Sequence, residues 1–466
     1  MQHIARALPC LALIAVACDA GSSSGDGGGS GGTGGQATTT QGTLSIAAGT
    51  RSPKNPGVLG VNYWLWSPTW DDNVAGTEPS IGRLKPGLLR VGGHNNDNNT
   101  PDPFDDAELD DAVAYARAVG AEPLLQVPLL SDAEGNPPSA ETAAAMVRYA
   151  NVTREYGVKY FSIGNEPDLY PDQEAGMASY SAADYCESVE AFVPAMLAVD
   201  PSIQIVGPDL SWKYQSGPLD WLTPILASCG ERFDVIAVHR YALAPEQTTI
   251  AEAASDAARF RSTIQSLRSK VAASPRGERP LAISEANITY NGDPTLPQFE
   301  ASPGTLPAGL WAADTLGVAL EENLWGLDFW SISEGWTLGL IDLNEQPRPA
   351  YFALTLFSEH FGDTLLKVAS APNGVRAYAS RTASDDTTQA IVINWTQSNV
   401  ELTVEVSGLT ASESLTAKFQ LPPLSVSALE MPDAGDPSGL VYSEAERSAG
   451  KEPSPLPTLS SALERE

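Results

Sequence analysis

Short apolar stretches with strand character alternate with helical stretches between residues 57 and 348 of this 466-residue chain. The helical stretches, such as 105–119 and 182–199, carry apolar residues at the spacing of an amphipathic helix. The strand-like stretches are nearly continuously apolar, which is typical of parallel strands covered on both faces. They lie at 58–66, 88–92, 123–127, 160–163, 204–206, 235–238, 281–284 and 324–330. Eight such units in roughly 290 residues predict a (β/α)8 barrel over residues 57–348, with a doubly wound open sheet as the alternative.

After residue 348 the pattern changes to short strands separated by turns. Strand-like stretches at 365–368, 375–379, 390–394, 401–406, 414–419 and 426–429 predict a β-sandwich domain over residues 349–432. Residues 43–56 are predicted to add a strand to it before the chain enters the barrel. Residues 433–466 are polar and contain prolines, so we expect a disordered tail there. The predicted fold class is therefore α/β, a (β/α)8 TIM barrel with a C-terminal β-sandwich domain.

The N-terminus has the pattern of an export signal. A short polar start precedes an apolar stretch at residues 8–17 that is too short to span a bilayer. The stretch ends in Cys18 and resembles a bacterial lipoprotein signal, in which residues 1–17 are removed and Cys18 carries the lipid. Residues 18–42 are rich in Gly, Ser and Thr and predict a flexible linker. We expect an exported lipoprotein of the bacterial cell envelope, at the outer surface or in the periplasm, that contacts membrane only through this lipid. Ordinary secretion is the alternative.

Charge and cysteine usage limit the partners. The formal net charge of -31 would repel phosphate backbones, so we expect no nucleic acid partner. No cysteine or histidine spacing resembles a zinc site, and we expect no metal, no cofactor and a monomer. Cys186 and Cys229 lie on two consecutive predicted helices. In an exported protein they could form a disulfide, and two buried free thiols are the alternative.

Two glutamates directly follow strand-like stretches. Glu166 follows the fourth stretch in the segment Ser-Ile-Gly-Asn-Glu-Pro, and Glu285 follows the seventh in the segment Ile-Ser-Glu-Ala. Because the C-terminal ends of barrel strands meet at one face, we expect these carboxylates to converge. Two facing carboxylates are the chemical minimum for cleaving a glycosidic bond. The sequence therefore predicts a glycosidase site.

Other polar and aromatic residues fall at the same strand ends. Arg90 follows the second strand, His239 and Tyr241 follow the sixth, and Trp330 follows the eighth. Three of them also have purely structural interpretations: Arg90 as an ion-pair partner, His239 as a hydrogen-bonded core histidine and Trp330 as apolar filler. Their shared position favours a role in the site. Trp64 lies at the end of the first strand. Together with Trp330 it is predicted to offer a flat face to a sugar ring.

The paired motifs resemble the retaining glycoside hydrolases of clan A, in which Gly-Asn-Glu-Pro ends the fourth strand and a second glutamate ends the seventh. This resemblance implies that Glu166 is the acid/base and Glu285 the nucleophile. It also implies that Asn165 contacts the sugar 2-hydroxyl and that Arg90 and Tyr241 orient Glu285. The implied reaction is double displacement at a β-glycosidic bond of an oligo- or polysaccharide.

Within this clan the chain is most similar to the β-glucuronidase and heparanase family. The similarity lies in the segments 164–167, 206–209 and 239–241, the last beginning with His239. In that family a tyrosine five residues after the nucleophile, followed by glycines, holds the substrate's uronic carboxylate. Tyr290 and Gly292 match this pattern, whereas Asn291 departs from it.

The resemblance therefore implies a β-glucuronidase-like enzyme. Two alternatives stay open. One is a hydrolase of the same clan that acts on neutral β-glycans, such as a xylosidase or an endo-glucanase. The other is a surface glycan-binding lipoprotein without catalytic activity.

Overall fold

The computed structural model describes residues 38–63, 74–99, 106–130, 137–244, 249–291, 299–333, 337–382, 384, 386–410 and 413–460. All of them belong to the second of two compact units, Thr38–Glu466. The predicted signal and most of the predicted linker, together with Cys18, Trp64 and Gly292, lie outside the described residues. Within the described ranges no helix is long and apolar enough to cross a membrane.

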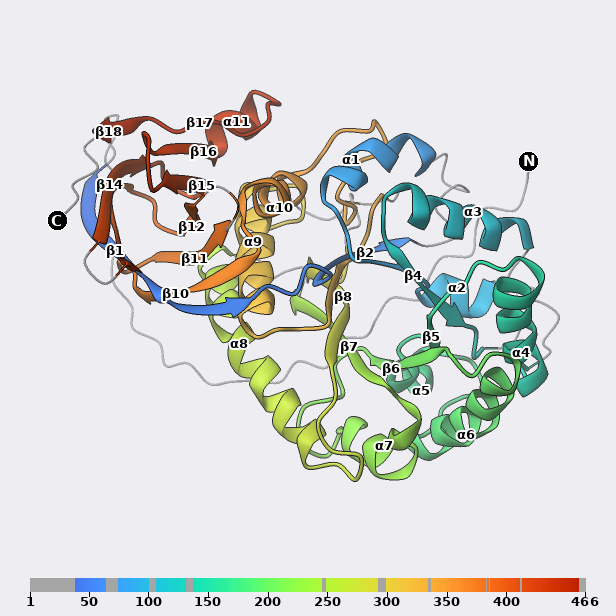
Figure 1. The fold of residues 1–466 in the computed structure, drawn as a ribbon. Coiled ribbons are helices and arrows are strands. Elements are labelled where there is room, and N and C mark those ends of the chain that lie inside the picture. The colour runs from blue at the N-terminus through green and yellow to red at the C-terminus, as the bar shows by residue number, and fades with distance from the viewer. Residues whose placement is uncertain are drawn as a thin grey trace, which may run out of the picture. The chain divides into compact units, whose positions relative to one another are not determined.

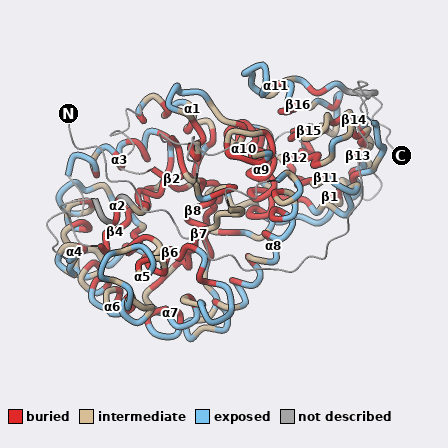
Figure 2. Tube along the Cα trace, turned by 180° about the vertical axis from the view of Figure 1, so that it is seen from behind, coloured by how far each residue is buried: buried red, intermediate tan, exposed pale blue. Residues whose placement is uncertain are grey.

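Eight parallel strands close into a barrel in the order of the chain, which confirms the predicted (β/α)8 fold (Figure 1). Closure comes from the pairing of the first barrel strand with the last. Nearly every strand residue is buried, because helices cover the outside and side chains fill the interior (Figure 2). The strands are β2 (Leu59–Tyr63), β3 (Leu88–Val91), β4 (Glu122–Val127), β5 (Tyr160–Ile163), β6 (Gln204–Leu210), β7 (Val235–Leu243), β8 (Leu281–Thr289) and β9 (Gly326–Phe329).

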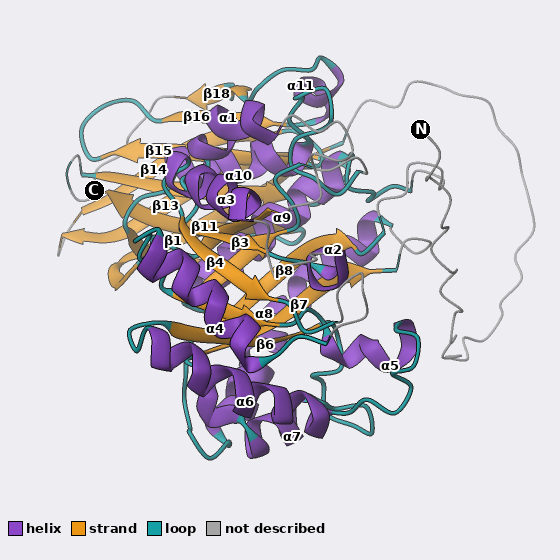
Figure 3. Ribbon diagram, turned by 90° about the vertical axis from the view of Figure 1, so that its right-hand side faces the viewer, coloured by secondary structure: helices purple, strands orange, loops and turns teal. Residues whose placement is uncertain are grey.

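Helices surround this barrel (Figure 3). Capping boxes begin several of them: Ser181 and Asp184 exchange hydrogen bonds at the start of α6, as Thr249 and Glu252 do at the start of α8. The helices of the barrel region are α1 (Glu78–Arg83), α2 (His94–Asn99), α3 (Asp106–Ala118), α4 (Ala140–Arg148), α5 (Tyr170–Gln173), α6 (Ala182–Val199), α7 (Leu222–Ser228), α8 (Ile250–Ala272), α9 (Leu306–Glu321) and α10 (Pro349–His360).

Helix α10 corrects the predicted boundary between the two domains. Residues 349–360 were expected to open the β-sandwich domain, but they form a helix that packs against α9. Pro349 occupies its first turn, where the missing N–H leaves no intrahelical bond unmade. The β-strands therefore start only at residue 364.

Two barrel strands are longer than predicted. β7 ends at residue 243 instead of 238, and β8 ends at residue 289 instead of 284. His239, Tyr241 and Glu285 therefore lie within strands and not after them. The β8–β9 ladder shifts register at this point, so the consecutive residues Ser284 and Glu285 are both buried in the barrel. The apolar stretches end earlier than the strands because the barrel mouth uses polar side chains.

A single curled sheet of ten strands forms the predicted β-sandwich, and an apolar core lies within it. Its strand from before the barrel, β1 (Thr39–Pro53), pairs with β10 and β13. The strand predicted at 43–56 is therefore present, and it begins inside the predicted linker. The other strands are β10 (Thr364–Ser370), β11 (Val375–Thr382), β12 (Thr387–Asn394), β13 (Asn399–Thr410), β14 (Glu413–Leu421), β15 (Ser425–Pro432), β16 (Ser438–Tyr442), β17 (Ser454–Pro455) and β18 (Thr458–Ser460).

The predicted disordered tail is wrong for residues 438–460. β16 pairs along β15, a short helix α11 (Glu444–Ser448) follows, and two further short strands join the sheet. Tyr442 is buried with its ring centre 4.9 Å from that of Phe352. A polar, proline-containing segment is ordered here because the edge of β15 offers backbone partners and α10 offers an apolar surface.

A disulfide joins α6 to the end of α7. The sulfurs of Cys186 and Cys229 are 2.03 Å apart, and both cysteines are buried. The structure thus pairs the two cysteines that the sequence left undecided between a disulfide and two free thiols.

Candidate active site

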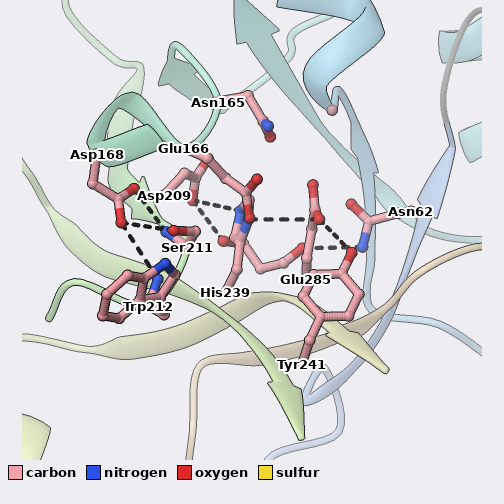
Figure 4. A network of polar contacts seen from close by, with 12 residues as sticks. Asn62, Asn165, Glu166, Asp168, Asp209, Ser211, Trp212, His239, Tyr241 and Glu285 are labelled. Atoms are coloured by element: carbon pink, nitrogen blue, oxygen red, sulfur yellow. Dashed lines mark hydrogen bonds and ion pairs between the residues drawn. The ribbon is translucent and has the colours of Figure 1, made fainter. Parts of the chain in front are cut away.

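Glu166 and Glu285 face one another at the same end of the barrel (Figure 4). One carboxylate oxygen of each, together with a ring nitrogen of His239, forms a group of atoms that all lie within 4.8 Å of one another. His239 Nδ1 is 2.9 Å from Glu166 Oε1 and 3.5 Å from Glu285 Oε2. The structure therefore brings together two carboxyl groups that are more than a hundred residues apart in the chain.

Glu285 is held at both of its carboxylate oxygens. Arg90 Nη1 donates to Oε1 at 2.7 Å, and the Tyr241 hydroxyl donates to Oε2 at 2.6 Å. The residue is only 4% exposed. Two donors, one of them a cation, complement the negative charge of the carboxylate and fix its orientation. Such an oriented anion is suited to attack an electrophilic carbon.

Arg90 is completely buried and holds several residues of the site. Besides Glu285, its guanidinium donates to Asn62 Oδ1 at 3.0 Å, Asn165 Oδ1 at 2.8 Å and Asp209 Oδ2 at 3.4 Å. Burial alone would lower the pKa of Arg90, but Asp209 and Glu285 outweigh it and the pKa is raised. Arg90 is therefore both an ion-pair partner and a residue of the site, because its ion pair is with Glu285.

Glu166 has the opposite environment. Its side chain keeps 18% exposure, and its pKa is raised to about 8, first by burial and then by the charge of Asp168, whereas His94 and Arg90 oppose the rise. The pKa of His239 is lowered by burial, against the charge of Glu285. At neutral pH Glu166 is therefore protonated and His239 is neutral. The two facing carboxyl groups are thus prepared for different tasks.

The backbone around Glu166 is fixed in an unusual conformation. Glu166 has φ 49° and ψ 50°, in the left-handed region that non-glycine residues rarely adopt, at a cost of about 1–3 kcal/mol. Its N–H donates to the carbonyl of Asp209 at 3.0 Å. The buried carboxylate of Asp97, on α2, accepts hydrogen bonds from the Asn165 N–H and the Tyr170 hydroxyl. Burial raises the pKa of Asp97 to about 6. These contacts hold Glu166 against its backbone strain.

A layer of buried polar side chains lies inside the barrel, one from each strand. Its members are Asn62, Arg90, Gln126, Ser162, Asp209, His239, Ser284 and Asp328. Ser284 Oγ donates to Asp209 Oδ1 at 2.5 Å, and burial raises the pKa of Asp328 far above its usual range. Except for Arg90 and His239, the members of this layer were not predicted to belong to the site. The available signal was a polar residue within an otherwise apolar strand, as at Asn62 and Gln126.

Two of the predicted aromatic residues, Trp330 and Tyr290, lie directly after barrel strands. Trp330 follows β9, and its ring lies against Gly93, where an added Cβ would meet Trp330 Cη2 at 2.4 Å. Tyr290 directly follows β8 and is 49% exposed. Trp212, at the end of β6, is 51% exposed and was not predicted. Trp64, like Gly292, lies outside the described residues.

The same cluster offers ligand atoms for a metal ion, because Glu166, His239 and Glu285 approach so closely. Both oxygens of Glu285 already accept hydrogen bonds, one of them from the Arg90 guanidinium. A divalent cation bound there would lie beside this guanidinium charge and lose much of its attraction. The residues therefore fit a pair of catalytic carboxyl groups better than a metal centre.

Comparison with known proteins agrees with this geometry. Residues 116–287 match the family model described as glycosyl hydrolase catalytic core. That range includes Glu166, His239 and Glu285. No curated protein matches the chain.

Solved structures share the fold at low sequence identity. The bifunctional glucanase-xylanase CelM2 from a metagenome library has a TM-score of 0.65 and 18% identity, over 85% of this chain and 100% of that one. An α-L-arabinofuranosidase from Thermotoga maritima has a TM-score of 0.66 and 16% identity, over 84% and 100%. A glycoside hydrolase family 39 β-xylosidase from Caulobacter crescentus has a TM-score of 0.59 and 16% identity, over 79% and 84%. Residues 116–287 therefore resemble a glycosyl hydrolase catalytic core, and the chain as a whole shares the fold of these solved structures.

Proposed function

We propose that this protein is a retaining glycoside hydrolase that cleaves β-glycosidic bonds by double displacement. One observation carries the proposal: Glu166 and Glu285 offer carboxylate oxygens within 4.8 Å of one another. Retaining enzymes hold their two carboxyl groups about 5–5.5 Å apart, whereas inverting enzymes leave about 6.5–9.5 Å for a water molecule. The separation of these oxygens is shorter than the range of inverting enzymes, which favours the retaining mechanism.

The different environments of Glu166 and Glu285 indicate what each residue does in the two steps of the reaction. In the first step Glu285 attacks the anomeric carbon while protonated Glu166 gives its proton to the glycosidic oxygen, so the leaving sugar departs as an alcohol. In the second step Glu166, now a carboxylate, takes a proton from water, and the water oxygen displaces Glu285 from the anomeric carbon. Configuration is inverted twice and therefore retained.

The surrounding residues serve these steps as positioning and binding groups. Arg90 and Tyr241 orient Glu285, and His239 lies between the two carboxyl groups. The side-chain oxygen of Asn165 accepts a hydrogen bond from the Arg90 guanidinium, which also binds Glu285, so its amide lies close to the two carboxyl groups. We assign it to the sugar 2-hydroxyl, as the clan resemblance implies.

For the sugar itself we propose a β-glucuronide. The support is the position of Tyr290, five residues after Glu285, directly beyond the end of β8 and half exposed. The alternative is a neutral β-glycan, and its support is that the similar structures are a glucanase-xylanase, an arabinofuranosidase and a β-xylosidase.

A panel of p-nitrophenyl β-glycosides separates these two candidates. We expect the β-glucuronide to be hydrolysed faster than the β-glucoside and the β-xyloside. Tyr290→Phe should lower kcat/KM for the glucuronide more than for the neutral sugars. Equal or better hydrolysis of the neutral sugars would remove the glucuronide assignment and leave the glycosidase intact.

The retaining mechanism has a direct test at Glu285. A 2-deoxy-2-fluoro glycoside with a dinitrophenolate leaving group should inactivate the enzyme, and peptide mass spectrometry should find the sugar on Glu285. Glu285→Gln should lower kcat by at least about 10³-fold. The matched control is Glu187→Gln, an exposed glutamate on α6. Turnover by Glu285→Gln equal to that of the parent would exclude Glu285 as the nucleophile. A parent that binds glycans but hydrolyses none of the substrates would favour the alternative of a glycan-binding protein whose barrel is not catalytic.

We also propose that the protein is exported and anchored through a lipid on Cys18, on the strength of the lipoprotein-like signal alone. Expression of the full chain with labelled palmitate should mark the protein and place it in the membrane fraction. Cys18→Ser should abolish both results. Unlabelled protein in the medium would indicate ordinary secretion.

A further inference from the structure

Trp212 is an unusual surface residue, because its side chain is exposed while its backbone is tightly held. Trp212 as a whole is 51% exposed. The carboxylate of Asp168, which is completely buried, accepts hydrogen bonds from the backbone N–H groups of Ser211, Trp212 and Lys213 at 2.9, 3.4 and 3.2 Å. It also accepts one from Ser211 Oγ at 2.7 Å. A single buried carboxylate therefore fixes the three-residue segment that presents the indole.

The following lysine strengthens this attachment. Lys213 is only 7% exposed, and its Nζ donates to the carbonyl of Asp168 and to Asp172 Oδ2, both at 2.7 Å. The same Nζ lies 5.6 Å from the centre of the Trp212 ring, which places a cation over one part of the indole. The ring is thus held in place without being covered.

The segment is attached to the loop of the acid/base residue. Asp168 lies two residues after Glu166, in the short 3-10 helix η4 (Pro167–Leu169), and its charge helps to raise the pKa of Glu166. In Figure 4 Asp168 and Trp212 lie on one side of Glu166, and Glu285 lies on the other side. The hydrogen bonds to Asp168 therefore tie the Trp212 segment to the short helix that directly follows Glu166.

The position of Trp212 relative to the two glutamates indicates which part of a substrate it could contact. Glu285 attacks the anomeric carbon and Glu166 protonates the departing oxygen, so the part of the substrate beyond that oxygen lies on the Glu166 side. An aromatic ring there can stack against the apolar C–H face of a second sugar ring. Rigid attachment favours this contact, because little conformational freedom is lost on binding.

We propose that Trp212 forms a binding subsite for a sugar ring on the leaving-group side, so that the protein acts on β-linked oligo- or polysaccharides and not only on simple glycosides. This inference rests on the proposed glycosidase function and on its assignment of Glu166 as the acid.

The test compares two substrates that share the same non-reducing sugar, the one preferred in the aryl glycoside panel. One is the β-linked trisaccharide, and the other is the β-glycosyl fluoride, whose leaving group is a single atom that cannot reach Trp212. We expect Trp212→Ala to lower kcat/KM for the trisaccharide by about tenfold, mainly through KM. The loss on the fluoride should be at least fivefold smaller. Trp212→Phe should restore most of the trisaccharide activity, and Val152→Ala, at a 56% exposed apolar residue on the outer surface, should change neither rate.

Equal losses on both substrates, or no loss on the trisaccharide, would overturn the inference. A parent enzyme that hydrolyses neither substrate would count against the proposed function, and binding then decides the inference separately. For this purpose the trisaccharide is titrated by calorimetry into Glu285→Gln and into Glu285→Gln/Trp212→Ala. Weaker binding to the double variant supports the subsite, and equal or undetectable binding to both refutes it.

Discussion

Replacing Glu166 by glutamine tests the assignment of acid and nucleophile most directly. The amide has nearly the shape of the carboxyl group and can keep the 2.9 Å contact with His239, but it cannot donate the catalytic proton. With a pKa of about 8, Glu166 is about nine-tenths protonated at pH 7 in the parent enzyme. General acid catalysis by a positioned side chain contributes roughly 10²- to 10⁴-fold. We expect a loss of that size only where the leaving group needs a proton.

The assay measures kcat/KM across pH for a phenyl β-glycoside and a 2,4-dinitrophenyl β-glycoside. Phenolate is a poor leaving group, so Glu166→Gln should lose roughly 10²- to 10⁴-fold on the first substrate and less than about tenfold on the second. Because only the protonated form of Glu166 donates, activity of the parent on the phenyl glycoside should fall as pH rises through about 8. The variant should lack this alkaline limb.

Two results would contradict the assignment of Glu166 as the general acid. The first is an equal loss on both substrates, which would point to general damage instead of a missing proton donor. The second is an alkaline limb near pH 8 that persists in the variant, which would assign the titration to another group. Glu187→Gln is the control and should match the parent on both substrates. Azide should accelerate the variant by attacking the covalent intermediate, and the glycosyl azide should have the configuration of the substrate.

Three further predictions concern the supports of the site and the limits of the fold. Tyr241→Phe removes a 2.6 Å hydrogen bond to the buried carboxylate of Glu285 and should lower kcat/KM by roughly 10- to 150-fold. The melting temperature should not change, and a fully active variant would show that Tyr241 does not position Glu285. Replacing Cys186 and Cys229 by serine removes a disulfide between residues 43 positions apart and should lower the free energy of unfolding in urea by about 4 kcal/mol. If reductant left the free energy of unfolding of the parent unchanged, the two thiols would be free. Deleting residues 433–466 removes at least Val441, Tyr442 and Leu456, the buried apolar side chains among the residues that the structure describes there, and should lower the free energy of unfolding by about 4 kcal/mol or more in the same denaturation; a disordered tail would cost nothing.

Much of the catalytic arrangement is readable from the sequence because it follows from a periodic pattern. Each strand–helix unit of the barrel can be recognised from its own stretch of sequence. In a closed parallel barrel the C-terminal ends of all strands then lie at one face. Glu166 and Glu285 could therefore be placed together without knowledge of any contact. The unequal environments of the two acids could be expected only in outline. Their actual causes, burial and Asp168 around Glu166 and two donors on Glu285, depend on packing.

Local patterns in the chain were enough to predict the barrel, the two glutamates and the presence of a β-domain, since strand and helix periods are local properties. Three features depend on tertiary contacts: the ends of β7 and β8, the ordered structure of residues 438–460, and the hydrogen bonds of Asp168 to the Trp212 segment. In each of these cases a polar segment gains its order from partners far away in the sequence. A local pattern records whether a residue is apolar, but not which donors and acceptors will surround it once the chain has folded.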